Sequence, residues 1–129
     1  MNKILVEVSV GELLDKISIL EIKKEKIKDQ NSLKFISDEY EILKNELEKN
    51  IKIDEKLNEM FNKLKEINSR LWVIEDNKRL CEKKSEFGEE FIKLSRDVHF
   101  LNDDRAKIKL EINNHTGSKI KEIKEYTSY

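Results

Sequence analysis

Residues 55–84 read EKLNEMFNKLKEINSRLWVIEDNKRLCEKK, and the turn SEFG at residues 85–88 follows them directly. Apolar side chains recur here every three or four residues, which is the spacing of one face of an α-helix. This seam consists of Leu57, Met60, Leu64, Ile67, Leu71, Ile74, Lys78 and Cys81. A helix of this length spans about 45 Å. The pattern therefore predicts one long helix over residues 55–84.

A second long helix is predicted over residues 89–114, after the short turn. Its seam has the same spacing and consists of Phe91, Leu94, Val98, Leu101, Arg105, Ile108 and Ile112. Gly117 suits the left-handed position that ends many helices. Because the turn is short, the two helices must form an antiparallel, coiled-coil-like hairpin.

The residues before the hairpin predict two shorter helices, at about 10–28 and 33–49. Ser9 with Glu12 forms a capping box for the first, Asn31 or Ser32 is the expected N-cap of the second, and Asp54 suits the N-cap of residues 55–84. We read residues 1–8 as a short strand or arm, and residues 118–129 as an extended or irregular tail that can pair with it. The expectation is an all-α single domain over residues 1–129, in which the two shorter helices cover the hairpin.

Composition excludes several classes of protein. Charged residues make up 41% of the 129 residues, but the net charge is only -1, so no basic field points to nucleic acid. No apolar run is long enough to span a membrane, and no signal peptide is visible, so we expect a cytoplasmic protein. Cys81 is the single cysteine and excludes an internal disulfide or a zinc-type cluster. We predict no cofactor. We also predict a homodimer, because an elongated hairpin buries only a small apolar core by itself.

Polar residues form a second stripe beside each seam of the hairpin. On the first long helix the stripe contains Asn68, Trp72, Glu75, Arg79 and Glu82, and on the second it contains Ser95, His99, Asn102, Ala106, Lys109 and Asn113. Folding the hairpin about Phe87 places Glu75 near His99, Trp72 near Asn102 and Arg105 near Asn68. Glu21 and Lys24 lie on the inward side of the first helix. These residues predict a polar layer inside a helical bundle.

Three hypotheses fit the polar layer. A salt-linked layer fixes helix register and oligomeric state without any ligand. Alternatively, Arg79, Arg105 and Lys109 bind a small anion, Trp72 supplies a flat wall, and Glu75 or His99 acts as a general acid or base. Docking of a partner protein is the third. A metal site is not predicted, because Asp76 faces away from Glu75 and no repeated Glu-x-x-Glu or Glu-x-x-His pair occurs.

Three parts of the sequence resemble one known family. They are Val8–Lys23, with VSVGE and ILEIK; Leu71–Glu82, with LWVIED; and Phe87–Tyr126, with NDDRA and TGS. The family consists of small bacterial and phage proteins classed as a domain of unknown function. The resemblance covers nearly the whole chain outside residues 30–60, and it implies no established activity. The sequence departs from the family pattern at Lys78, where an apolar residue is usual, and at His99, where Tyr is usual.

The candidate ligand-binding residues are those on which spacing and resemblance agree, together with Lys109. They are Trp72, Glu75, Arg79, Glu82, Asn102, Arg105, Lys109 and Asn113; no catalytic residue is assigned. The first functional hypothesis is a non-enzymatic helical binding or scaffold module. The alternative is a small all-α enzyme or sensor that binds an anionic metabolite, such as a sugar nucleotide, phosphate or carboxylate. It requires a solvent-reachable cavity between the first helix and the hairpin.

Overall fold

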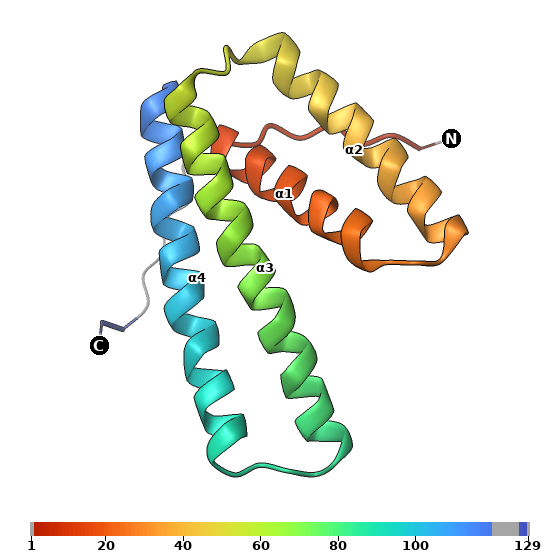
Figure 1. Cartoon of the computed structure of the whole chain (residues 1–129). Helices are drawn as coiled ribbons and strands as arrows, with labels where there is room; N and C mark the ends of the chain where they lie inside the picture. Colours follow the sequence, from red (N-terminus) through yellow and green to blue (C-terminus); the bar gives the residue numbers. More distant parts are fainter. Residues whose placement is uncertain (1, 120–126, 129) are drawn as a thin grey trace.

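A computed structural model of the chain describes residues 2–119 and 127–128. Its four helices are α1 (Val10–Lys26), α2 (Gln30–Asn50), α3 (Glu55–Lys83) and α4 (Glu89–Thr116), and the described residues contain no strand. Figure 1 shows α3 and α4 side by side as a long hairpin, with α1 and α2 standing at an angle on its upper half. The predicted all-α fold is confirmed.

The turn between α3 and α4 is built from residues 84–88. Ser85 has a positive φ of 55°, and the Glu86 N–H donates to the Cys81 carbonyl at 2.9 Å. At the far end of α4, Gly117 has a φ of 69° and its N–H donates to the Asn113 carbonyl, as the sequence predicts for a left-handed helix end. The short turn at residues 84–88 makes α3 and α4 antiparallel.

The cover over the hairpin is centred on α1, which packs against α2, α3 and α4. Side chains from all four helices form one apolar core, so α2 is tied to the hairpin through this shared cluster. The core consists of Leu14, Ile17, Leu47, Leu57, Met60, Leu64 and Ile112. The hairpin contributes to this core from the first three turns of α3 and the last turns of α4, which lie at the upper end in Figure 1. The lower half of the hairpin extends beyond the α1–α2 pair.

The start of α2 differs from the predicted position. The N-cap is Asp29, whose side chain accepts hydrogen bonds from the Ser32 N–H at 2.9 Å and the Ser32 hydroxyl at 2.7 Å. The prediction of Asn31 or Ser32 as N-cap is therefore wrong, and α2 begins at Gln30. Asp29, Asn31 and Ser32 all have side chains that can cap a helix. Residue type alone therefore does not show which of the three is the N-cap.

Residues 2–8 form no regular secondary structure and are exposed. We call them the arm. The predicted pairing of the tail with the arm depends mainly on residues 120–126 and 129, which lie outside the described residues. Within the described part of the chain, no helix combines the length and apolar character needed to cross a membrane.

Candidate functional site

The first turn of α1 is pressed against α4 at Gly11. The Gly11 N–H donates to the Asn113 side-chain oxygen at 2.7 Å, and a Cβ added to Gly11 would lie only 2.6 Å from the Lys109 carbonyl oxygen. The Ser9 hydroxyl accepts from the Glu12 N–H at 3.1 Å, which confirms this half of the predicted capping box. Glycine at position 11 therefore lets the two helix backbones approach closely.

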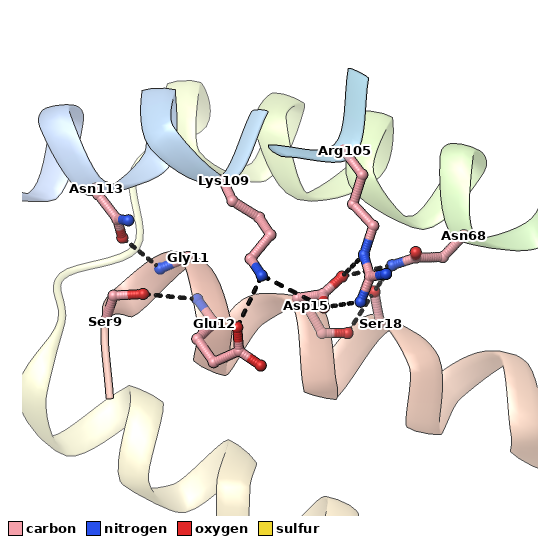
Figure 2. Close-up of polar contacts among 9 residues, drawn as sticks. All are labelled: Ser9, Gly11, Glu12, Asp15, Ser18, Asn68, Arg105, Lys109 and Asn113. Atoms are coloured by element: carbon pink, nitrogen blue, oxygen red, sulfur yellow. Dashed lines mark hydrogen bonds and ion pairs between the residues drawn. The ribbon is translucent and has the colours of Figure 1, made fainter. Parts of the chain in front are cut away.

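One turn further along α1, Asp15 is buried between α3 and α4. Arg105 on α4 donates two hydrogen bonds to its carboxylate, from Nε to Oδ1 at 2.9 Å and from Nη2 to Oδ2. Asn68 on α3 donates to Oδ1 at 2.8 Å and also lies 2.8 Å from the Ser18 hydroxyl oxygen. Figure 2 shows these side chains converging from three helices. Arg105 and Asn68 meet at one oxygen atom, as the folded hairpin predicts.

Lys109 continues this polar layer toward the start of α1. Its Nζ lies 2.7 Å from the Glu12 carboxylate and 3.9 Å from the Asp15 carboxylate. Glu12 and Asp15 thus balance the charges of Arg105 and Lys109. Among the described residues, every buried side-chain nitrogen or oxygen has a hydrogen-bond partner. The layer therefore has the satisfied hydrogen bonding expected of a structural element.

A groove of about 420 Å³ opens beside the layer, between α1 and α3. Its floor and walls are mainly apolar, and its rim is charged. The lining residues are Ile19, Ile22, Asn68, Leu71, Trp72, Glu75, Asp76, Arg79 and Arg105. Ile22 and Leu71 are buried, whereas Glu75, Asp76 and Arg79 are exposed. We call this feature the α1–α3 groove.

Six of the eight predicted site residues belong to the groove or to the buried layer, and Arg105 belongs to both. Trp72, Glu75, Arg79 and Arg105 line the groove, and Lys109 and Asn113 belong to the buried layer. Glu82 and Asn102 are not among the residues that line the groove, and Glu82 is exposed on the lower part of the hairpin. The predicted stripe is therefore continuous on the helices, but α1 reaches only its upper part.

Sequence reasoning missed the residues that α1 contributes, namely Glu12, Asp15 and Ser18. A signal was present, because Asp15 and Ser18 alternate with Leu14 and Ile17 on the face of α1 that becomes buried. Glu21 and Lys24 belong to a different cluster. Glu21 accepts from the Tyr40 hydroxyl at 3.2 Å and pairs with Lys65 at 3.1 Å, while the Lys24 ammonium lies 4.3 Å from the centre of the Tyr40 ring.

Neither a metal site nor a reactive thiol emerges from this geometry. No three His, Cys, Asp or Glu side chains converge on a possible metal position within residues 2–119 and 127–128. Burial raises the pKa of the Cys81 thiol above its usual value, which disfavours the nucleophilic thiolate. Cys81 therefore behaves as a small apolar residue in the hairpin seam.

The comparisons with known proteins agree with the resemblance noted in the sequence. Residues 4–129 match the family model DUF6165, which is described as a family of unknown function. No curated protein and no solved structure matches the chain. Because the family match covers nearly the whole chain, this protein belongs to the DUF6165 family of unknown function.

Proposed function

We propose that this chain is a non-enzymatic helical binding module, and that its α1–α3 groove receives a segment of polypeptide. The observation that carries the proposal is the composition of the groove. Ile19, Ile22, Leu71 and Trp72 provide an apolar surface, while Glu75, Asp76 and Arg79 surround it with charges of both signs. An apolar centre with a polar rim is the usual arrangement of a protein-binding surface.

The buried polar layer supports this function by positioning the groove. The Asp15–Arg105 pair and the Gly11–Asn113 hydrogen bond attach α1 to α4 at two points along the helix. These contacts fix the angle at which α1 crosses the hairpin, and hence the separation of Ile19 and Ile22 from Trp72. Buried polar groups and ion pairs are known to select one arrangement of packed helices.

The charges of the groove argue against a strongly anionic ligand. Arg105 is paired with Asp15, and the positive charge of Arg79 is accompanied by Glu75 and Asp76 on the same rim. A site for phosphate or sugar nucleotide normally presents an excess of cationic donors. A polypeptide segment with apolar side chains and few charges fits the groove better.

A small-molecule sensor or enzyme is the second candidate function. Trp72, Arg79 and Arg105 do line one cavity, and its volume of about 420 Å³ lies within the range of pockets for small ligands. This candidate predicts that an anionic metabolite raises the unfolding temperature of the chain. It also predicts that the increase disappears in Arg79→Ala.

Binding of a purified partner tests the proposed function. Immobilised chain captures candidate proteins from cells, each candidate is purified, and its dissociation constant is measured with the chain in solution. The proposal expects at least about tenfold weaker binding by Trp72→Ala, since large aromatic residues dominate such interfaces. Val73→Ala is the matched control, because Val73 is exposed on α3 and does not line the groove. Equal losses in both variants, or turnover of a metabolite that Arg79→Ala abolishes, would contradict the proposal.

A further inference from the structure

The arm is a second apolar surface that this chain leaves open to solvent. Ile4 is 86% exposed, Leu5 81% and Val6 74%, although all three are strongly apolar. An extended segment of such residues also has backbone N–H and C=O groups available for pairing. Exposed apolar segments of this kind commonly mark interaction sites.

In an extended conformation the arm has one predominantly apolar side. Successive side chains of an extended chain point in opposite directions, so Ile4, Val6 and Val8 share a side. Ser9, where the arm joins α1, has an extended backbone with φ and ψ of -70° and 159°. The high exposure of Ile4, Leu5 and Val6 shows that the arm does not pack on the helices that it passes. Figure 1 shows the arm running from the start of α1 away from the hairpin. The arm therefore does not occupy the groove of its own chain.

The arm and the α1–α3 groove complement each other chemically. The apolar side of the arm matches the apolar residues of the groove, such as Leu71 and Trp72. Lys3 and Glu7 flank the apolar run with opposite charges. Lys3 and Glu7 lie on the side of the arm opposite Ile4, Val6 and Val8, so they reach the rim by extending their long side chains sideways. There Glu75 and Asp76 can pair with Lys3, and Arg79 can pair with Glu7. Apolar contact supplies the attraction, and the charges select the direction in which the arm lies.

We propose that the α1–α3 groove binds the arm of a second copy of this chain. With two-fold symmetry each copy gives its arm to the other, so one homodimer contains the same contact twice. This inference rests on the proposed function, because it names the polypeptide that the groove receives. It also completes the site, since the arm of the partner covers the face of Trp72 that the chain itself leaves open.

Disulfide trapping between two different variants tests this arrangement. One chain carries Val6→Cys, the other carries Glu75→Cys, and Cys81→Ala is present in both. Mixed under mild oxidation, the two chains are expected to form a covalent heterodimer at least about tenfold faster than a control pair. The control pairs Val6→Cys with Lys34→Cys, whose position on α2 is exposed and outside the groove. Equal rates for the two pairs would overturn the proposal.

Sedimentation velocity provides a second test that keeps Cys81 intact. The native chain is expected to be dimeric, and Ile4→Asp/Val6→Asp is expected to raise the dimer dissociation constant by at least about a hundredfold, since each dimer loses two contacts. Phe35→Asp/Ile42→Asp places the same two charges on exposed apolar residues of α2 and should remain dimeric. A native chain that stays monomeric at high concentration, or an arm variant that stays dimeric, would overturn the proposal.

The two proposals fail in different ways. If the chain is monomeric but Trp72 is still required for binding another purified protein, the arm is not the occupant and the binding function stands. If neither the arm nor any protein requires Trp72 for binding, the groove is not a polypeptide site and both proposals fail.

Discussion

Asp15 and Arg105 make unequal contributions to the buried layer, although they form one ion pair. The Asp15 side chain is 1% exposed, whereas the Arg105 side chain is 30% exposed. When one partner is removed, the cost depends on whether the remaining charge can return to water. Without Asp15, the charge of Arg105 can be hydrated, whereas without Arg105 the buried charge of Asp15 cannot.

The first prediction follows from this asymmetry. Arg105→Ala should lower the free energy of unfolding by about 3–5 kcal/mol, because it leaves a buried carboxylate without its main partner. Asp15→Ala should lower the free energy of unfolding by less, about 2 kcal/mol. In this variant Asn68 keeps its hydrogen bond to the Ser18 hydroxyl oxygen, and the Arg105 side chain becomes hydrated. In the double variant, removal of Asp15 should restore part of the stability lost with Arg105. Urea unfolding measures all three values, and additive losses would refute the asymmetry.

The second prediction concerns Gly11. Helix propensity alone would make Gly11→Ala stabilising by about 1 kcal/mol. The added Cβ would meet the Lys109 carbonyl oxygen at 2.6 Å, however, and this backbone atom cannot move without shifting α4. We therefore expect a net destabilisation of about 1–3 kcal/mol by thermal or urea unfolding. Gly88→Ala is the control, because no atom lies within 4 Å of its added Cβ, and its effect should not exceed about 1 kcal/mol.

At the scale of whole elements, α3 depends on a cap that also contacts α4. The Asp54 carboxylate accepts from the Leu57 N–H at 2.8 Å and lies 2.9 Å from His115 Nε2 in the last turn of α4. The backbone hydrogen bond from Leu57, followed by the hydrogen bond from His115, lowers the pKa of Asp54 below its usual value of 3.8. This one side chain therefore secures the upper end of the hairpin.

The third prediction is a loss of stability in acid. A carboxylate with a lowered folded pKa contributes stability above its unfolded pKa, and that contribution disappears as the pH falls through the folded pKa. Asp54→Asn should therefore be less stable than the native chain at pH 6, and the difference should shrink as the pH falls below about 4. Unfolding temperatures measured between pH 6 and pH 2 check this. A difference that stays constant over the range would contradict the role of the Asp54 charge.

The fourth prediction concerns the cluster that joins α1, α2 and α3. Burial, followed by the charge of Glu21, raises the pKa of Tyr40, and hydrogen bonding to Glu25 raises the pKa of Lys65. Both groups thus contribute stability below their unfolded pKa values, and this stability is lost as the pH rises through the folded ones. The native chain should lose stability above about pH 10. Tyr40→Phe should show a smaller alkaline loss in the same melting series, and an equal loss would reject the part assigned to Tyr40.

Sequence patterns predicted the elements better than their contacts. The hairpin was predictable because its apolar seams keep one spacing over many turns. The polar stripe beside the seam of α4 also identified Lys109 and Asn113 as residues of the buried layer. Asp15 was missed because a polar residue beside Leu14 faces water or the core depending on how α1 crosses the hairpin. Glu82 was included because helical spacing does not show where α1 ends relative to α3. Sequence periodicity defines the faces of helices, whereas tertiary packing decides which faces meet.

For the whole molecule, the arrangement of α1 on the hairpin connects the fold with the proposed binding function. The buried layer fixes the upper half, and the α1–α3 groove opens where α1 leaves α3. Figure 1 shows that the lower half of the hairpin extends beyond this cover. Trp72 is the single tryptophan of the chain and lies in the wall of the groove, so its fluorescence reports directly on occupation of the groove.

A fluorescence titration of Trp72 tests directly whether the α1–α3 groove binds the arm. The Ile4→Asp/Val6→Asp variant keeps the groove available, and a peptide with the sequence of residues 2–9 is added in parallel with sugar nucleotides, phosphate and carboxylated metabolites. We predict a saturable blue shift of Trp72 emission with the peptide, because burial removes water from the indole ring, and no saturable change with the metabolites. A saturable response to a metabolite, abolished by Arg79→Ala and absent with the peptide, would contradict binding of the arm and identify the groove as a small-molecule site.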